Sequence, residues 1–308
     1  KLVGKYISKG SIVIYESTVY PGVTDEVCTP ILEKESGLVF NIDFSTGYSP
    51  ERIVPGDKVN TIEKIKKVVS GSNQETLDIV TYLYSSIIDA GIHQAPTIKI
   101  AEASKVTENI QRDVNIALIN ELHQMYTLLG IDTHEVIEAA SSKWNFMKLK
   151  PGLVGGHCIS IDPYYLMHKS KMSGYSPDLM IKAREINEGM GEWVVSSFLR
   201  YAKDQNIDLH AINVTILGYT FKENCGDIRN TKVKDIIFSI KELGVSVSLW
   251  DPLLDMAELD KLESDGIIVH RAAPRDLQFV FLCVPHNEIL EFLETYDGPL
   301  FDYKNIAY

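Results

Sequence analysis

The stretch 212–251 decides the fold, because strand-like, helix-like and strand-like segments follow one another in it. Residues 212–219 read INVTILGY, residues 233–243 read VKDIIFSIKEL and residues 245–251 read VSVSLWD. The outer two segments are rich in β-branched and apolar residues, whereas the middle one has helical spacing. The same alternation continues through 257–263, 267–270, 279–285 and 287–293. This pattern predicts an α/β domain with a parallel sheet over residues 208–308.

The first hundred residues show the same alternation. Strand-like and helix-like segments follow one another at Ser11–Glu16, Val23–Lys34, Lys67–Ser70, Thr76–Ile88 and Thr97–Ala101. They predict βα units on a parallel sheet over residues 1–101. No strand in them runs into Gly-x-Gly-x-x-Gly, the fingerprint that opens a dinucleotide-binding domain, and the opening residues already look helical. We therefore expect that the beginning of such a domain is missing.

The middle of the chain, residues 102–207, is predicted to be mostly helical. From Glu102 to Gly130, apolar residues recur at the three-and-four spacing of one long amphipathic helix. A loop rich in glycine and proline, Lys150–Cys158, follows, and helical spacing resumes at Pro163. The two α/β ends and this helical middle give three predicted regions.

The composition narrows the class of protein. The chain has 308 residues, 45% of them hydrophobic and 23% charged, with a formal net charge of -12. An acidic chain without a basic stripe is a poor partner for nucleic acid, and no apolar run approaches the roughly 20 residues that span a bilayer. We expect a cytoplasmic protein. A nucleotide ligand remains compatible, since a few basic side chains and helix N-termini can hold a diphosphate.

The four cysteines are spaced for neither a metal site nor a disulfide framework, so each is judged alone. Cys283 lies in a continuous apolar run and is predicted to be core, and Cys28 is predicted to pack on a helix. Cys158 ends the motif Gly155-Gly156-His157-Cys158, in which paired glycines leave a thiol accessible on a turn. From these residues alone, a nucleophile and an incidental cysteine in a helix-entry loop explain the motif equally well.

Other polar residues could join that chemistry. Lys105 and Asn109 are four apart on the long helix and could offer an ammonium and an amide to one oxyanion, although a solvated helix face is the commoner explanation. Asp162 follows Cys158 by four residues, which places both on one side if the segment is helical. Thr18 and Glu51 each follow a predicted strand, where α/β proteins place ligand contacts, and either could equally be a cap or turn residue.

Five motifs, in order along the whole chain, resemble the UDP-glucose/GDP-mannose dehydrogenase family. They are Ser17-Thr-Val, Ser49-Pro-Glu-Arg with Pro55-Gly-Asp57, Lys105-x-x-x-Asn109, Gly155-Gly-x-Cys158-x-x-x-Asp162, and Gly218-x-x-Phe-Lys222 with Gly226-Asp-x-Arg229. The resemblance implies a Rossmann-like NAD domain, represented by its C-terminal part over residues 1–101. It also implies a central helical dimerisation and catalytic domain over 102–207 and a Rossmann-like UDP-sugar domain over 208–308.

The resemblance implies a role for each matched residue. Cys158 would form a thiohemiacetal and then a thioester at C6 of the sugar, so that one site performs both NAD-dependent oxidations. Lys105 and Asn109 would stabilise the oxyanions, Asp162 and Thr18 would assist proton transfer, and Glu51 would position the hydrolytic water. The implied substrate contacts are Arg52, Gly155, Gly156, Lys222 and Arg229, and the implied cofactor contacts are Ser17, Thr18, Glu51 and Arg229. The resemblance implies no metal. It implies a homodimer that forms through the long helix.

The substrate branch is indicated by two details. The stretch Glu51–Asp57 looks like a signature of members acting on UDP-N-acetylhexosamines, with Val54 in place of an asparagine, and Gly156-His-Cys-Ile159 also resembles that branch. UDP-N-acetylglucosamine or its galacto epimer is expected, ahead of UDP-N-acetylmannosamine and UDP-glucose, with a place in surface polysaccharide synthesis. A non-catalytic sugar-nucleotide-binding and dimerisation module, and a cysteine hydrolase, are the rival classes. Without the glycine fingerprint, this chain alone is expected to turn over poorly.

Overall fold

The computed structural model describes residues 1–54, 57 and 59–306. The predicted motif residues Pro55 and Gly56 therefore lie outside the described residues. The chain forms two compact units, one of residues 1–111 with 161–177 and the other of residues 112–160 with 178–308. Helices of the predicted middle region are divided between the two, and the three-domain boundaries stay a prediction.

The first unit is built on a four-stranded sheet in the order β1 (Ser11–Tyr15), β2 (Phe44–Tyr48), β3 (Lys67–Gly71), β4 (Ile92–Gln94). The sheet is mixed, because β2 and β3 run antiparallel while β1 with β2 and β3 with β4 are parallel. A parallel pair needs a crossover, usually a long helix, and the described residues between β2 and β3 hold only a three-residue helix. The expectation of a wholly parallel sheet is wrong at this pair.

The helices of the first unit include the segments predicted to be helical at Val23–Lys34 and Thr76–Ile88. They are η1 (Val3–Lys5), η2 (Thr24–Cys28), α1 (Thr29–Ser36), η3 (Ile62–Lys64), α2 (Gln74–Ser85), α5 (Asp162–Met172) and the start of α3 (Ile98–Leu129). The segment Thr97–Ala101 does not continue the alternation as a separate element, because β4 precedes it and α3 begins at Ile98. The Thr97 hydroxyl accepts the Ile100 N–H at 3.2 Å, which satisfies a donor in the first turn of that helix.

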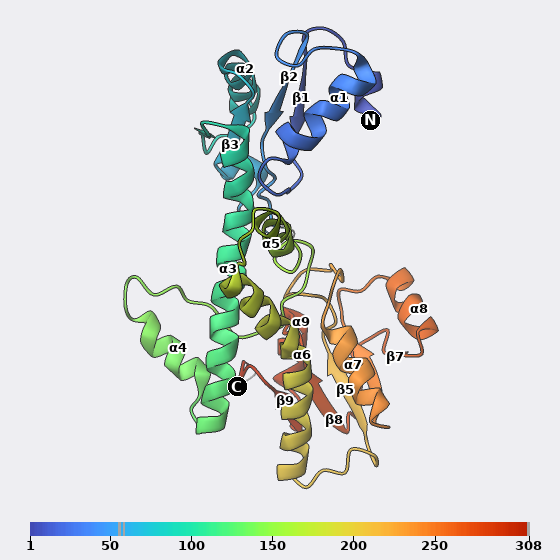
Figure 1. The fold of residues 1–308 in the computed structure, drawn as a ribbon. Helices are drawn as coiled ribbons and strands as arrows, with labels where there is room; N and C mark the ends of the chain where they lie inside the picture. Colours follow the sequence, from blue (N-terminus) through green and yellow to red (C-terminus); the bar gives the residue numbers. More distant parts are fainter. Residues whose placement is uncertain (55–56, 58, 307–308) are drawn as a thin grey trace. The chain divides into compact units, whose positions relative to one another are not determined.

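The second unit has a five-stranded sheet in the order β7 (Ile268–Val269), β6 (Ser246–Trp250), β5 (Asn213–Leu217), β8 (Phe279–Leu282), β9 (Leu300–Asp302). All four strand pairs are parallel, which confirms the prediction for this end of the chain. Its helices are α4 (Thr133–Ser141), α6 (Asp178–Asp204), α7 (Val233–Glu242), α8 (Met256–Ser264), α9 (Asn287–Leu293) and the end of α3 (Figure 1).

The core of the second unit explains why α6 holds its sheet. Phe198 of α6 is fully buried and its ring packs against Phe279, Phe281 and Phe301 of β8 and β9, with centroids 5.0–5.6 Å apart. Aromatic side chains of this size dominate the apolar area that a core removes from water. Cys283, at the end of β8, is buried beside them, and burial raises the pKa of its thiol, as expected of a core cysteine.

The strand order sets the position of a ligand site. The chain moves outward from β5 to β6 and β7 and then returns to lay β8 against the other side of β5. In open α/β sheets, ligands bind beyond the carboxyl ends of the strands at such a switch point. The loops that follow Leu217 and Leu282 are therefore where a site is expected. Among the described residues, no helix is long and apolar enough to cross a membrane.

Candidate functional site

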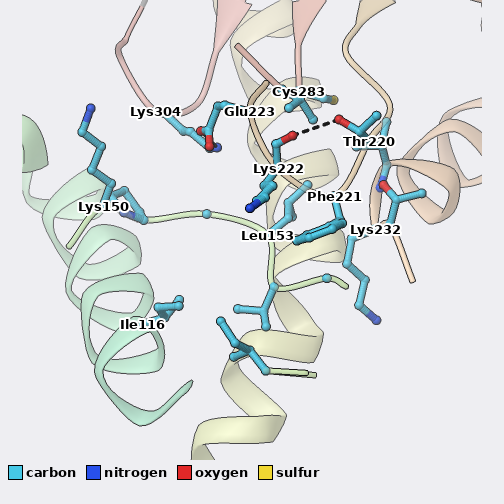
Figure 2. A pocket seen from close by; sticks show the side chains of 18 of the residues that line it. Ile116, Lys150, Leu153, Thr220, Phe221, Lys222, Glu223, Lys232, Cys283 and Lys304 are labelled. Atoms are coloured by element: carbon cyan, nitrogen blue, oxygen red, sulfur yellow. Dashed lines mark hydrogen bonds and ion pairs between the residues drawn. The ribbon is translucent and has the colours of Figure 1, made fainter. Parts of the chain in front are cut away.

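A cavity of about 290 Å³ opens in the second unit where the loops after β5 and β8 face the loop 150–159. Figure 2 shows how its lining residues lie. Thr220, Phe221 and Lys222 come from the loop after β5, and Cys283 and Val284 come from the end of β8. The loop rich in glycine and proline therefore lies at the switch point of the sheet. Apolar residues of the loop 150–159 and of other segments complete the wall, namely Leu153, Val154 and Ile159 from the loop and Ile116, Val233 and Ile306 from elsewhere.

The charge on the wall of this cavity is mostly positive. Lys150, Lys222, Lys232 and Lys304 line it with a single carboxylate, Glu223. Lys304 lies 3.5 Å from Glu223. Burial favours the protonated acid, but the nearby lysines outweigh it and hold the pKa of Glu223 below its ordinary value. An apolar wall with an excess of lysines suits a ligand that combines an apolar or planar body with phosphate charge.

The two glycines of the 155–158 motif are required by their neighbours. A Cβ on Gly155 would lie 2.8 Å from the carbonyl oxygen of Asn230 and 2.9 Å from the Cβ of Phe221. Gly156 has a φ of +80°, and a Cβ there would lie 2.9 Å from the Phe221 ring. The turn is closed by hydrogen bonds from Gly156 N to Arg229 O and from Asn230 Nδ2 to Gly156 O, both of 3.0 Å. The glycines thus let the backbone approach Phe221 and Asn230.

Cys158 lies on this turn with an exposed side chain. Residues 156–161 form turns and α5 begins only at Asp162. The segment between Cys158 and Asp162 is therefore not helical, and the expectation that helical spacing places them on one side is wrong. Asp227 raises the pKa of Arg229 above its ordinary value, with smaller contributions from Cys158 and Cys225. Arg229 itself is exposed and pairs with Asp227 at 2.5 Å. Cys158 is the accessible thiol of the second unit, since Cys225 and Cys283 are both buried.

Replacing Gly155 by alanine is expected to lower the free energy of unfolding by about 1–3 kcal/mol, the usual cost of forcing an extra carbon into a packed site. Gly189→Ala is the matched control, because nothing lies within 4 Å of a Cβ at that position of α6. Alanine there is expected to be neutral or to stabilise by about 0.5–1 kcal/mol, as in other helix interiors. Urea denaturation of both variants measures the difference, and equal stabilities would contradict the packing argument.

In the first unit, the helix α3 carries Lys105 and Asn109 into a buried place. Their exposed fractions are 8% and 4%. The alternative expectation, that the two residues lie on a solvent-exposed face of the helix, is therefore wrong. Asn109 Nδ2 donates to Asp162 Oδ2 at 2.5 Å, and Asp162 is buried at the first turn of α5. The structure therefore brings together an amide and a carboxylate that lie 53 residues apart in sequence. A buried cation on the same helix face is suited to stabilising negative charge.

The other predicted residues of the first unit lie just beyond the ends of β1 and β2. The Ser17 carbonyl accepts the Tyr48 hydroxyl at 3.1 Å, and Thr18, half-buried, follows it. Glu51 is exposed, and its Oε1 accepts the N–H groups of Arg52 and Ile53 at 2.6 and 2.7 Å. Thr18 and Glu51 thus each follow a strand, as predicted, and the structure shows that these two strands are parallel neighbours. The turn role that was the alternative for Glu51 agrees with its contacts in this structure.

Arg52 makes its contacts within the first unit. Its guanidinium pairs with Glu108 at 2.8 Å and donates to the Lys66 carbonyl at 2.5 Å. Its predicted role in substrate binding stays a prediction, as do the roles of the other site residues. No group of three or more His, Cys, Asp or Glu side chains that could hold a metal ion occurs among the described residues.

Several residues of the site were not found by sequence reasoning. Lys150, Lys232 and Lys304 line the cavity from segments up to 154 residues apart, and no spacing in the sequence connects them. Glu102 is fully buried in the first unit and accepts the N–H groups of Gly22 and Thr24, at 2.5 and 2.8 Å. A glutamate at an apolar position of the long helix was the available signal for it, because a buried carboxylate requires donors.

Comparisons with known proteins identify one family along the chain. Three models of the UDP-glucose/GDP-mannose dehydrogenase family match it: the NAD binding domain at residues 1–88, the central domain at 99–189 and the UDP binding domain at 215–307. Protein CapL of Staphylococcus aureus is 49% identical over 310 residues, and the match covers 99% of this chain and 73% of CapL. A UDP-N-acetyl-D-glucosamine 6-dehydrogenase of Pseudomonas aeruginosa is 55% identical over 287 residues, covering 93% of this chain and 68% of that protein.

The solved structures give the same fold. A UDP-D-ManNAc dehydrogenase from Pyrococcus horikoshii superposes with a TM-score of 0.83 at 27% sequence identity. The match covers 96% of this chain and 66% of that one. The chain thus spans about two thirds to three quarters of the length of these proteins.

Proposed function

Because the chain belongs to the UDP-glucose/GDP-mannose dehydrogenase family, we propose that it oxidises the C6 alcohol of a UDP-N-acetylhexosamine to the uronic acid with NAD. The observation that carries the proposal is the position of Cys158. Its neighbours Gly155 and Ile159 line the lysine-rich cavity, and its own side chain is exposed on the turn between them. A reactive thiol beside a site for a nucleoside diphosphate is what two successive oxidations of one sugar carbon require.

The substrate class is supported by the cavity and by the names of the relatives. Lys150, Lys222 and Lys232 offer ammonium donors to a diphosphate, and the apolar wall offers contact area to the base and the acetamido methyl group. UDP-N-acetyl-D-glucosamine is the named substrate of the Pseudomonas aeruginosa relative. UDP-N-acetylmannosamine and UDP-glucose are the alternatives that the assay below ranks.

Two oxidations and one hydrolysis take place at the same sugar carbon, and Cys158 is bonded to that carbon between them. The C6 alcohol loses a hydride and its hydroxyl proton to become an aldehyde, and the Cys158 thiol then adds across the carbonyl. The resulting thiohemiacetal loses a second hydride and a proton and becomes a thioester. Water then adds to the thioester and the C–S bond breaks, which releases the carboxylate and restores the thiol. When bound, NAD supplies the hydride acceptor for each oxidation.

Residues of the first unit are assigned the supporting roles. The buried Lys105 ammonium and Asn109 amide stabilise negative charge on the C6 oxygen. Asp162, which accepts the Asn109 amide, takes up a proton with the help of Thr18, and Glu51 orients the hydrolytic water. Arg52 and Arg229 are assigned to substrate binding, and Arg229 to the cofactor as well.

The first unit fits part of a cofactor site. Ser17, Thr18 and Glu51 lie beyond the carboxyl ends of two parallel strands, where α/β sheets hold nucleotides. The loops after β1 and β2 are tied together, since Glu51 N donates to Glu16 O at 3.2 Å and Tyr48 holds the Ser17 carbonyl. These residues would hold part of NAD, which would supply the hydride acceptor. A cytoplasmic location belongs to the same proposal, because both reactants are charged, water-soluble nucleotides.

The test is the number of NADH molecules formed for each uronic acid. Purified protein, at a concentration high enough to measure the slow turnover expected of this chain alone, is supplied with NAD and UDP-N-acetylglucosamine, with UDP-N-acetylmannosamine and UDP-glucose in parallel. Both products are quantified, and their ratio does not depend on the rate. Two NADH for each uronic acid, with UDP-N-acetylglucosamine turned over fastest, are expected. One NADH with release of the aldehyde, or turnover of a thioester substrate without NAD, would overturn the proposal in favour of a simple alcohol dehydrogenase or a cysteine hydrolase.

The lysines of the cavity are expected to determine the affinity for the nucleotide. Lys222→Ala should weaken UDP binding about ten-fold, the scale of one charge-assisted hydrogen bond, and Lys304→Ala should weaken it further because Glu223 then faces the diphosphate unpaired. Both losses should shrink at high salt. Calorimetric titration with UDP measures them, and Lys203→Ala, at an exposed position of α6, is the matched control. Equal affinities in all three variants would count against the assignment.

A homodimer through α3 is part of the proposal. Leu118, Met125, Leu128 and Leu129 are all exposed and recur on one face of this helix. Leu128→Glu is expected to shift the protein towards monomer in sedimentation velocity. Leu179→Glu, at an equally exposed position of α6, should not. A dimer that both variants leave unchanged would place the interface elsewhere.

A further inference from the structure

A buried histidine, His286, follows β8 in the second unit and contacts Asp251, which follows β6. It is 1% exposed, and its Nδ1 accepts the N–H of Asn224 at 2.8 Å. The proton of the neutral ring is therefore on Nε2, which lies 3.1 Å from both Asp251 Oδ2 and Thr220 Oγ1. Thr220 Oγ1 in turn donates to the Lys222 carbonyl at 3.0 Å (Figure 2). One ring thus holds two points of the loop 220–224.

Asp251 anchors the start of the same loop. Its Oδ2 accepts the N–H groups of Tyr219 and Thr220 at 2.6 and 3.1 Å, and its Oδ1 accepts that of Leu253 at 2.8 Å. Burial favours the protonated acid, but the hydrogen bonds from His286 and the backbone hold the pKa of Asp251 below its ordinary value. An acid at the end of the second strand of such a sheet commonly binds a ribose. Here its oxygens are engaged by the protein itself, so its role is internal.

The loop held in this way carries Phe221. Phe221 N donates to Asp227 O at 3.1 Å, and its side chain is the group that a Cβ on Gly155 or on Gly156 would strike. The ring therefore lies directly against Gly155 and Gly156, at the start of the turn that carries Cys158. The same loop supplies Phe221, Lys222 and Glu223 to the cavity wall. A displacement of residues 220–224 would move both the wall and the support of the turn.

The geometry points to Asp251 and His286 as positioning residues that hold Phe221 against the Gly155-Gly156 turn. Through this contact they fix the position of the Cys158 thiol relative to the cavity. The hydrogen bonds support this role, because Asp251 Oδ2 accepts the N–H groups of Tyr219 and Thr220 and His286 Nδ1 accepts that of Asn224, so both side chains hold backbone of the loop 219–224. A buried donor or acceptor that loses its partner is costly, so the loop has one strongly favoured conformation. The significance of this for catalysis rests on the proposed function, but the positioning itself does not.

The test compares local amide exchange with global stability in the 308-residue chain. His286→Leu removes both ring nitrogens and is expected to speed hydrogen exchange of the Gly156 amide about ten-fold, the scale of one lost buried hydrogen bond, and to weaken UDP binding by a similar factor. His286→Asn is the conservative rescue, because its carboxamide oxygen can accept the Asn224 N–H in place of Nδ1. It should restore exchange and affinity to within about three-fold of the natural chain.

Two further variants separate positioning from general destabilisation. Ile240 is buried in α7 and lies outside both the loop and the cavity. Ile240→Ala should therefore lower Tm as far as His286→Leu does, but it should leave hydrogen exchange of the Gly156 amide unchanged. Phe221→Leu leaves the buried pair in place and should speed Gly156 exchange with a smaller loss of Tm. Equal Gly156 exchange in His286→Leu and Ile240→Ala, or no rescue by His286→Asn, would overturn the inference. Failure of the natural chain to bind UDP would count against the proposed function only, because the exchange measurement needs no ligand.

Discussion

Cys158→Ser is expected to stop formation of the uronic acid while leaving UDP binding within about two-fold of the natural protein. The hydroxyl of serine is a far weaker nucleophile than a thiolate, and its ester would be less activated towards water than a thioester. Loss of a covalent nucleophile costs roughly a thousand-fold or more in turnover. Chromatographic detection of the uronic acid measures the first effect, and calorimetric titration with UDP measures the second.

Cys28→Ser provides the control, because Cys28 is half-buried in the first unit and is assigned no part in the reaction. It should retain turnover within about two-fold. Uronic acid formed by Cys158→Ser at more than about a tenth of the natural rate would remove the thioester from the mechanism. A parallel loss of UDP affinity would instead show that the substitution had disturbed the cavity.

Arg184→Leu is expected to cost about 3–5 kcal/mol of stability, the penalty for breaking a buried ion pair on one side. The Arg184 and Asp113 side chains are 3% and 1% exposed and pair at 2.6 Å, so the substitution leaves a carboxylate in the core. Arg184 also pairs with Glu188, which in turn holds Lys232 of the cavity wall. Lys182→Leu is the control, because Lys182 lies on the same helix and forms an exposed ion pair with Glu185. It should change the free energy of unfolding by no more than about 0.5–1 kcal/mol.

The loss in Arg184→Leu should depend on pH. Burial raises the pKa of Asp113, and Arg184 opposes that rise, so its removal moves the pKa further up. A group whose pKa is raised on folding takes up a proton more readily in the folded state, and the folded variant therefore recovers stability as the pH falls. Urea denaturation at about pH 8 and pH 5 should show the gap to the natural protein narrowing at pH 5. A gap independent of pH would mean that Asp113 finds another partner.

The fold was predictable where the apolar pattern was strong. The strands and helices from Ile212 to Leu293 were found because continuous runs and helical spacing report burial directly. The strand Leu300–Asp302 was missed, since three residues carry too little pattern to distinguish a strand from a turn. The direction of β3 was also beyond the pattern, because periodicity gives the faces of a strand and not its orientation.

The sequence identified many residues of the site, but it did not show which of them lie close together in space. Gly155 and Gly156 were recognisable, but the reason for them, the Phe221 ring, lies 65 residues or more away. Lys105 and Asn109 follow helical spacing, yet their burial depends on packing that one helix cannot reveal. The lysines of the cavity and the buried Asp251 and His286 come together only through the strand order, which sets loops after β5, β6 and β8 side by side.

The four cysteines differ in solvent exposure, and this difference allows one of them to be labelled selectively with a thiol-reactive dye. Cys225 and Cys283 are closed to solvent, Cys28 is half-buried with a pKa raised by burial, and Cys158 is open on its turn. Maleimides react with accessible thiolates, so a limiting amount of dye should mark Cys158 first. A fluorophore attached there would sit beside the cavity without any engineered residue. The residue that makes the protein a candidate enzyme is thus also a ready point of attachment for an optical sensor of nucleotide sugars.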